Sequence, residues 1–557
     1  MPVSYVGLCL LVATLHGASV GAAASSSSPV QERLEALVSP WSSDDAPGVA
    51  VGVLRDGQVI YRAGAGLADL GFGVPIEVDT VFHAASVTKQ FTAFAVLTLV
   101  AAGDVSLEDD IRSHLPDLAY AGPPITIQHL LDHMSGLREA SSLAQMAGWR
   151  PDDVFTEAQR LALLSRQVAL NFAPGAEVEY SNSGYALLAA LVEKLTGQSF
   201  RAFLQQTVFD RLGMDRSHLR TDLTEVIADR ARSYAPARTG FVRRPLNYEI
   251  VGSTGLQTTV SDLLLWAKAL NEGALAPPEV HELMEVRSRA ADGEPSVFGR
   301  GQESRIHRGL QTWSHGGTDA GFKSFLMRIP DENFAVAILS NRADFDTAEL
   351  AFAIVDTLFF DGPEPLAAFD PASPTELASF AGDYELFPGT IFTITTDGET
   401  LFFATLGAEE GAPLPQVGDR EFLLDPARDL SLVFDPPVDG RSGAFSWTIG
   451  LHGALDVPRV KLDPFDSQEL DLNVYEGRFR SPELGIEYRI EAIDTRLVLH
   501  HHRLPSTPLN AYQTDTFQGE AQVGRVVFVR DGAGRVDRAL FSSPLADDVV
   551  FDRVFPE

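Results

Sequence analysis

Three short motifs bring together residue types that can carry out acyl transfer. Ser86 and Lys89 stand three positions apart, at the start of an apolar segment whose pattern predicts a buried helix. Positions three apart share one face of a helix, so the Lys89 amine can reach the Ser86 hydroxyl. A serine becomes a strong nucleophile when a base takes its proton, and a lysine can be that base where burial lowers its pKa. The pair predicts a serine nucleophile, although the same spacing also occurs at ordinary helix starts.

A second motif places Tyr180 two residues before Asn182, in the stretch FAPGAEVEYSNSGY. A phenol held near a lysine ammonium can have a lowered pKa and pass a proton, and the amide of Asn182 can hold a substrate carbonyl. Taken alone, these residues also fit a turn asparagine beside a packed tyrosine.

A third motif, HGGT at residues 315–318, follows a strand-like run. Its two glycines let a substrate backbone lie along the strand, and the amide of Thr318 can form an oxyanion hole together with the amide of Ser86. A plain glycine turn between two strands is the alternative. The order and separation of all three motifs carry the interpretation.

The ordered set Ser-x-x-Lys, Tyr-x-Asn and His-x-Gly resembles that of the penicillin-recognising serine hydrolases. The similar branch holds class C β-lactamases, D-alanyl-D-alanine carboxypeptidases, D-aminopeptidases and related esterases, and the likeness covers about residues 30–361, including ITIQHLLDHMSGL and GSTGLQTTVSDLLLWAKAL. The resemblance implies that Ser86 is the nucleophile and that Lys89 and Tyr180 share the general acid and base work. It implies a substrate-binding set of Asn182, His315, Gly317 and Thr318.

One departure from the family pattern bears on the substrate. Many β-lactamases and carboxypeptidases carry Lys-Thr-Gly where this chain has a histidine at 315, and a histidine near pH 7 is mostly neutral. The chain therefore looks more like the D-aminopeptidase side, acting on small molecules or short peptides that include D-amino acids. A class C-type β-lactamase and a non-catalytic protein that binds peptidoglycan fragments are the alternatives, and the oligomeric state is left open.

The chain is expected to have an α+β catalytic domain followed by β-rich units. The resemblance implies a β-lactamase-like domain, with a five-stranded antiparallel sheet flanked by helices plus an all-helical region. Beyond it, FAGDY and YEGRF begin two similar β-patterned halves, which suggests two small antiparallel β-barrels. The predicted boundaries are a leader at 1–24, the catalytic domain at 30–361, a linker at 362–374, and barrels at 375–465 and 470–557.

The composition of the chain limits which kinds of partner and which location we expect. A formal charge of -33 disfavours nucleic acid, which binds basic patches, and no stretch beyond the leader is expected to span a membrane. An apolar run from Val6 to Leu15 followed by small residues predicts a cleavable leader and a secreted or periplasmic protein of bacterial type, although no Lys or Arg precedes the run. The only cysteine, Cys9, lies in this leader, so a mature chain would offer no thiolate. We expect no cofactor and no metal.

Polar residues outside the three motifs are candidates for a metal site or an ammonium site. His129 and His133 have the spacing of a zinc-binding helix but lack the glutamate of metalloproteases, and packed or surface histidines are also expected at 500–502. A D-aminopeptidase-like enzyme must hold a substrate ammonium, for which the third motif offers no carboxylate. The polar stretch 503–522, with Asp515 and Glu520, is one candidate, and an exposed hairpin loop without a role is the alternative.

Overall fold

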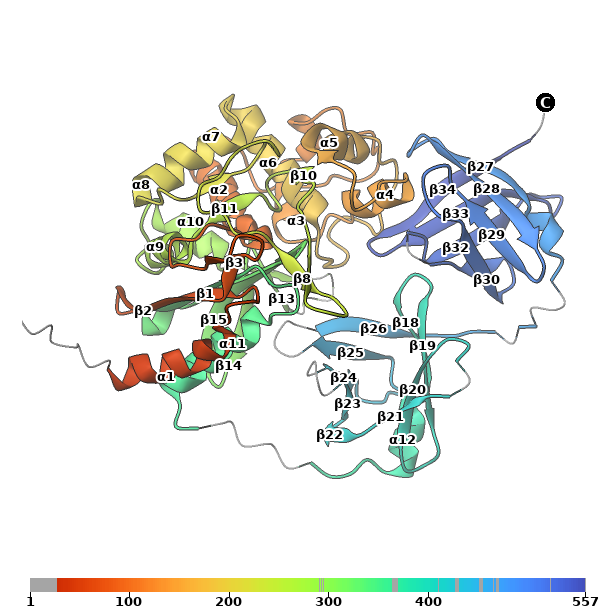
Figure 1. Cartoon of the computed structure of the whole chain (residues 1–557). Helices are drawn as coiled ribbons and strands as arrows, with labels where there is room; N and C mark the ends of the chain where they lie inside the picture. Colours follow the sequence, from red (N-terminus) through yellow and green to blue (C-terminus); the bar gives the residue numbers. More distant parts are fainter. Residues whose placement is uncertain are drawn as a thin grey trace, which may run out of the picture.

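The computed structural model describes residues 28–555, apart from gaps at 290, 292, 294, 363–368, 409, 426–429, 450–453, 464, 467–469 and 521. The predicted leader lies outside the described residues, so its cleavage and the secreted location stay predictions. The same holds for the middle of the predicted linker. Figure 1 shows a unit of helices and strands followed by two β units, the last of which lies beside α4 (Ala140–Met146). The predicted α+β class is confirmed.

A central antiparallel sheet carries the third motif. It has eight strands where five were expected, because three short strands, β12 to β14, extend the edge beside β15. β1 and β17 are apolar except at their last residues, Arg55 and Ser340, and such runs favour strands that are buried on both faces. In spatial order the strands are β12 (Arg287–Arg289), β13 (Pro295–Gly299), β14 (Glu303–His307), β15 (Leu310–Asp319), β16 (Phe322–Ile329), β17 (Phe334–Ser340), β1 (Val49–Arg55) and β2 (Gln58–Ala65).

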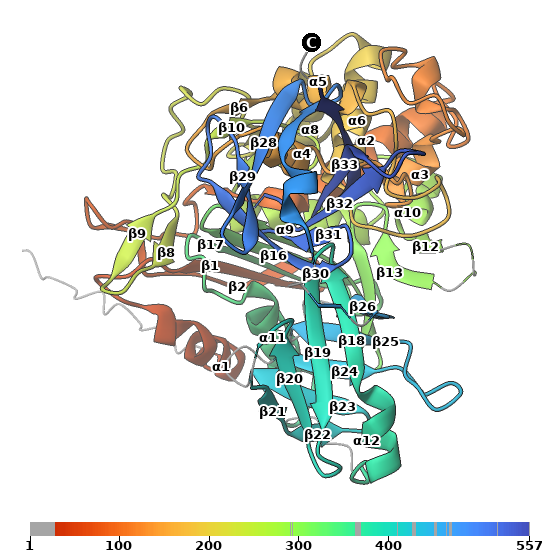
Figure 2. The ribbon, with the colours of Figure 1, turned by 90° about the vertical axis from the view of Figure 1, so that its right-hand side faces the viewer.

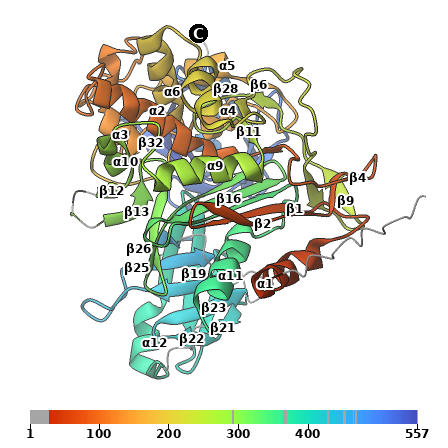
Figure 3. The same ribbon diagram turned by 90° about the vertical axis from the view of Figure 1, so that its left-hand side faces the viewer.

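Helices cover both faces of this sheet. Figure 3 shows α9 on one face, with α1 and α11 on the other. Each of the three begins at a residue whose side-chain oxygen accepts a hydrogen bond from a backbone N–H of the first turn, which is a strong helix-start signal. Their bounds are α1 (Pro29–Val38), α9 (Val260–Asn271) and α11 (Thr347–Phe359).

A helical region beside the sheet surrounds α2 (Thr88–Ala102). The segment Ala85–Ala102 is the one helix within the described residues that is long and apolar enough, by length and composition alone, to cross a membrane. It lies in the protein core and packs against α6 and α10. The other elements here are α3 (Ile127–Leu131), α5 (Glu157–Ser165), α6 (Asn182–Thr196), α7 (Phe200–Leu204), α10 (Pro278–Met284), β5 (Phe82–His83), β7 (His218–Leu219), β10 (Tyr248–Glu249) and β11 (Leu256–Thr258).

Two antiparallel β units follow the domain that carries the three motifs. The first, after α12 (Pro374–Phe380), is a nine-stranded sheet in which β21 approaches β23, so it is nearly closed. The second is a closed barrel, joined by pairing of β27 with β34. The first unit contains β18 (Gly382–Phe387), β19 (Thr390–Thr396), β20 (Leu401–Thr405), β21 (Ala412–Leu414), β22 (Gln416–Gly418), β23 (Glu421–Asp425), β24 (Leu430–Phe434), β25 (Ala444–Ile449) and β26 (Ala454–Val460). The barrel contains β27 (Gly477–Ser481), β28 (Ile486–Ile493), β29 (Arg496–His500), β30 (Thr507–Gln513), β31 (Thr516–Gln518), β32 (Arg525–Arg530), β33 (Val536–Ser543) and β34 (Ala546–Val554).

The closed barrel packs against the helical region through a buried ion pair. Arg138 Nη1 lies 3.1 Å from Glu483 Oε2, and the two side chains are only 2% and 6% exposed. Nearby, the Tyr488 hydroxyl donates to the Met146 carbonyl at 2.6 Å. Figure 2 shows the barrel strands in front of α4. This contact joins the C-terminal barrel to the domain that carries the three motifs.

Replacing Glu483 is expected to destabilise the protein. Glu483→Ala leaves the Arg138 guanidinium buried without its carboxylate, and breaking one partner of a buried pair costs about 3 to 5 kcal/mol in free energy of unfolding. Urea denaturation measures this loss in the free energy of unfolding. The matched control is Asp552→Ala, which breaks the half-exposed pair with Arg538 and is expected to cost under about 1 kcal/mol. Equal losses in the two variants would contradict the interpretation.

Candidate active site

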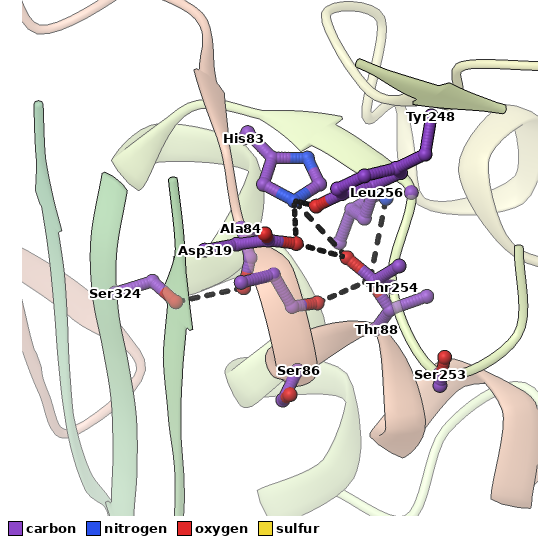
Figure 4. Close-up of polar contacts among 12 residues, drawn as sticks. His83, Ala84, Ser86, Thr88, Tyr248, Ser253, Thr254, Leu256, Asp319 and Ser324 are labelled. Carbon is purple, nitrogen blue, oxygen red and sulfur yellow. Dashed lines mark hydrogen bonds and ion pairs between the residues drawn. The ribbon is translucent and has the colours of Figure 1, made fainter. Parts of the chain in front are cut away.

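Ser86 lies in a tight turn between β5 and α2. Ala85 before it adopts a left-handed conformation, with φ 45°, which is strained for a residue other than glycine. The turn is held at Ala84, whose N–H donates to the Leu256 carbonyl at 2.9 Å. The Ala84 carbonyl accepts from Ser324 Oγ at 2.7 Å (Figure 4). Ser86 is partly exposed while its neighbours on both sides are buried. The fold therefore presents this one hydroxyl to the surface.

Lys89 lies fully buried behind Ser86. Its Nζ lies 3.2 Å from Ser86 Oγ, 2.7 Å from Asn182 Oδ1 and 3.0 Å from the Ser253 carbonyl oxygen. Burial lowers the pKa of Lys89 to about 7. A neutral amine has two N–H groups and one lone pair; the two carbonyl oxygens can only accept, whereas the hydroxyl can donate. The neutral form therefore directs its lone pair at the Ser86 hydroxyl.

Tyr180 lies beside this pair, but its pKa moves opposite to our expectation. Lys89 Nζ stands over the face of the ring, 4.7 Å from its centroid. Burial raises the pKa of Tyr180, and the neighbouring Ser86 hydroxyl offsets this only in part. The phenol therefore stays protonated at neutral pH, and Lys89 is the stronger candidate for the base.

Asn182 and His315 complete the polar wall of the site. Asn182 begins α6, and its side-chain amide oxygen accepts a hydrogen bond from Lys89 Nζ. The N–H groups of the same amide can therefore bind other partners. The His315 ring is buried, and its Nδ1 donates to the Gly316 carbonyl at 2.6 Å. Burial, together with the charge of Lys89, lowers the pKa of His315 to about 3. Position 315 therefore carries no positive charge at neutral pH.

Gly317 allows β15 to lie against the Ser86 turn. A Cβ atom at Gly317 would stand 2.6 Å from the Ala84 carbonyl oxygen and 3.0 Å from Ala85 Cβ. No side chain fits, so the glycine sets the spacing between the Ser86 turn and Thr318. A cavity of about 330 Å³ opens here, and all three motifs line it. A larger hollow between α1 and β2 is lined by none of the motif residues.

The other candidates from the sequence do not join the site. His129 Nδ1 accepts from the Thr126 N–H, and His133 Nδ1 accepts from the Ser181 N–H, so the two histidines serve separate backbone groups. Within the described residues, no three His, Cys, Asp or Glu side chains gather as metal ligands would. Asp515 lies in a β-turn with its carboxylate 2.7 Å from Arg530 Nη2, so it is already paired inside the barrel. Glu520 is exposed.

The structure adds Glu139, which the sequence did not single out. Its N–H donates to the Leu545 carbonyl of the β33–β34 turn at 2.7 Å, and its Oε2 accepts from the Asn182 N–H at 2.9 Å. A second link runs from the Asp547 N–H to Asn171 Oδ1 at 3.0 Å. The Asn171 amide donates in turn to Glu179 Oε2, next to Tyr180, at 2.9 Å. The C-terminal barrel therefore supports the second motif at both ends, through Asn171, which binds Glu179, and through Glu139, which binds the Asn182 N–H.

The buried lysine predicts a pH profile. Only neutral Lys89 can accept a proton, so kcat/KM for an uncharged ester is expected to rise about tenfold per pH unit up to about pH 7 and then level off. The measurement is the rate profile from about pH 5 to about pH 9. A rate that is flat through pH 7, or that falls there, would count against Lys89 as the base.

Glu139→Gln tests the charge that acts on this lysine. The negative charge of Glu139 raises the pKa of Lys89, so its removal is expected to lower that pKa further and move the rising limb to lower pH. Glutamine keeps an oxygen for the Asn182 N–H. The exposed-pair variant Asp552→Ala is the control and should leave the limb in place. A limb that moves to higher pH in Glu139→Gln would refute the electrostatic account.

Comparisons with known proteins give a matching family and several relatives. The beta-lactamase family model matches residues 30–359, more than half of the chain. The D-aminopeptidase of Gluconobacter oxydans (strain 621H) is 30% identical over 312 residues, which cover 56% of this chain and 58% of that protein. The D-aminopeptidase of Cereibacter sphaeroides (strain ATCC 17029 / ATH 2.4.9) is 26% identical over 453 residues, covering 80% and 82%.

A solved structure extends the likeness of fold. The octameric penicillin-binding protein homologue from Pyrococcus abyssi superposes with a TM-score of 0.55 at 23% identity, covering 85% of this chain and 98% of its own. The match to the Gluconobacter relative spans less than two thirds of that protein's length, so activity does not follow from it alone. The family resemblance read from the three motifs is confirmed: the chain belongs to the beta-lactamase family.

Proposed function

We propose that this protein is a serine hydrolase that cleaves amide or ester bonds of D-amino acid derivatives or short peptides through an acyl-enzyme on Ser86. One observation carries the chemistry: Lys89 Nζ is surrounded by two oxygens that can only accept and one hydroxyl that can donate. Such a site orients a neutral amine toward its nucleophile. The curated relatives named D-aminopeptidase support the substrate class.

In the proposed reaction, Lys89 Nζ takes the proton from Ser86 Oγ as the oxygen attacks the substrate carbonyl carbon. The negative charge on the tetrahedral oxygen is held by the backbone N–H groups of Ser86 and Thr318, which Gly317 brings together. The carbon–nitrogen or carbon–oxygen bond then breaks, and the leaving atom receives a proton. Water repeats the sequence on the acyl-enzyme, returning Ser86 as a hydroxyl.

Tyr180 is the proposed donor to the leaving group. Its raised pKa keeps the phenol protonated until a more basic leaving nitrogen develops. In the second half of the reaction the Tyr180 phenolate takes a proton from the attacking water, and the Lys89 ammonium returns its proton to Ser86 Oγ, 3.2 Å away. The two side chains thus act as one relay, with lysine as the base and tyrosine as the acid.

The substrate class is tested by comparing hydrolysis of D-amino acid amides, their L-enantiomers, short-chain esters and a chromogenic cephalosporin. We expect D-amino amides and esters to be cleaved faster than the cephalosporin, because neutral His315 offers no fixed charge to its carboxylate. Preference for the L-enantiomers would refute the D-amino acid proposal. Binding of all four without turnover would instead support a non-catalytic binding protein.

A class C-type β-lactamase is the second candidate, because one lysine does line the cavity. Lys323 Nζ lies 3.1 Å from Thr318 Oγ1, and within the described residues no carboxylate lies in ion-pair distance of it. Such a cation could hold a substrate carboxylate from the opposite side of β15. Rapid cephalosporin turnover that is lost in Lys323→Ala would favour this second function.

A further inference from the structure

The carboxylate of Asp319, one residue after the third motif on β15, has no place in the proposed chemistry. Alternate residues of a strand share a face, so Asp319 lies on the same face of β15 as His315 and Gly317. Gly317 abuts Ala84 and Ala85, and Asp319 Oδ2 lies 3.1 Å from His83 Nε2. β15 thus runs beside the segment that leads into Ser86. Asp319 directly follows Thr318, whose N–H is one of the two proposed oxyanion donors.

Asp319 is also tied to the backbone that holds the catalytic lysine. Thr254 Oγ1 donates to Asp319 Oδ2 at 3.2 Å, and the carbonyl of the preceding residue, Ser253, accepts from Lys89 Nζ at 3.0 Å. Figure 4 shows the Asp319 carboxylate between His83 and Thr254, close to the turn that carries Ser86. The carboxylate is therefore fixed relative to the nucleophile and its base by adjacent residues of one segment.

The surroundings of Asp319 leave its negative charge uncompensated. Arg230 Nε donates to Gln257 Oε1 at 2.8 Å, which turns the amide nitrogen of Gln257 toward His83 Nδ1 at 2.9 Å. His83 therefore accepts at Nδ1, and its Nε2 faces Asp319 Oδ2. Among the residues described, no Lys or Arg lies within ion-pair distance of this carboxylate, and its side chain is 22% exposed.

We propose that Asp319 is the ammonium-binding residue of the acyl subsite, where it takes the free α-ammonium of an aminoacyl substrate. The inference rests on the proposed hydrolase function and takes the place of Asp515, which Arg530 already neutralises. In an aminoacyl group the α-nitrogen lies only about 2.5 Å from the carbonyl carbon that Ser86 attacks. The ammonium of a bound substrate must therefore lie near the oxyanion hole, beside which Asp319 is placed.

The test compares two anilides that differ only by the ammonium, D-alanine p-nitroanilide and propionic acid p-nitroanilide. Asp319→Asn is nearly isosteric and is expected to lower the ratio of kcat/KM for the amine over the neutral anilide by about 10- to 100-fold, the loss of one charge-assisted hydrogen bond. Asp319→Glu keeps the charge and should recover a large part of the ratio. Asp515→Asn is the matched control and should leave the ratio at its wild-type value.

The outcomes separate the two proposals. An unchanged ratio in Asp319→Asn, with both anilides still turned over, overturns the ammonium site and leaves the hydrolase standing. A ratio that falls equally in Asp319→Glu also overturns it, because geometry rather than charge would then decide. Failure of the wild-type protein to cleave either anilide refutes the hydrolase function and the ammonium site with it.

Discussion

Ser86→Ala is expected to lower kcat/KM by at least about a thousandfold, because the variant keeps only substrate binding and the oxyanion hole. The hydroxyl is the partly exposed group of a buried turn, and Lys89 Nζ stands 3.2 Å from it. No other described hydroxyl hydrogen-bonds to this amine. The measurement is steady-state hydrolysis of a D-amino amide by variant and wild type, prepared in parallel.

Folding controls make this result interpretable. The small substitution at a partly exposed position should leave the urea midpoint close to that of the wild type. A variant that is folded and still shows a burst of product equal to the enzyme concentration would rule out Ser86 as the nucleophile.

Gly317→Ala is the second substitution with a large expected effect. The new methyl would stand 2.3 Å from Ser324 Oγ and 2.6 Å from the Ala84 carbonyl oxygen, well inside van der Waals contact. β15 or the Ser86 turn must move, which separates the two backbone N–H groups of the oxyanion hole. Losing one such donor costs about a hundred- to a thousandfold in kcat, and we expect a loss of that size.

The neighbouring glycine provides the matched control. A Cβ atom at Gly316 would come no closer than 3.5 Å to Phe325, an ordinary contact, so Gly316→Ala is expected to keep kcat/KM within about tenfold of the wild type. Thermal unfolding of both variants checks that the sheet is intact. Equal activities for the two alanine variants would mean that the close approach at Gly317 does not set the oxyanion geometry.

The three motifs could be found from the sequence because each depends on local spacing. Ser86 and Lys89 are one helical turn apart, and Asn182 begins the helix that follows Tyr180. The residue types alone predict a serine nucleophile with a lysine base before the fold is known. The structure brings all three motifs to one cavity, as the resemblance implied.

Other parts of the site depend on contacts between distant segments. The Ser253 carbonyl, the Glu139 carboxylate and the Asp319 carboxylate reach the site only through tertiary packing. Gly252, before Ser253, has φ 89°, a conformation that favours glycine, but a glycine in the sequence does not show that the Ser253 carbonyl contacts Lys89. The role of the C-terminal barrel was likewise hidden, since its support for Glu139 comes from a backbone carbonyl, which any residue can offer.

Two expectations about the site failed for physical reasons. The pKa of Tyr180 was expected to fall beside an ammonium, but burial dominates, and the amine faces the ring rather than the phenol oxygen. Residues 503–522 were expected to form a long loop, yet β30 and β31 form a hairpin within them, and Asp515 is paired with Arg530. A run of polar residues does not distinguish a loop from exposed strands.

Covalent labelling tests the account of Ser86 and Lys89 most directly. A fluorophosphonate probe, followed by peptide mapping and by the labelling rate at several pH values, reports the nucleophile and its base together. We expect a single adduct on Ser86, formed at a rate that rises with pH and levels off above about pH 7, and no adduct in Ser86→Ala. An adduct on another residue, or a labelling rate at Ser86 that does not change through pH 7, would contradict it.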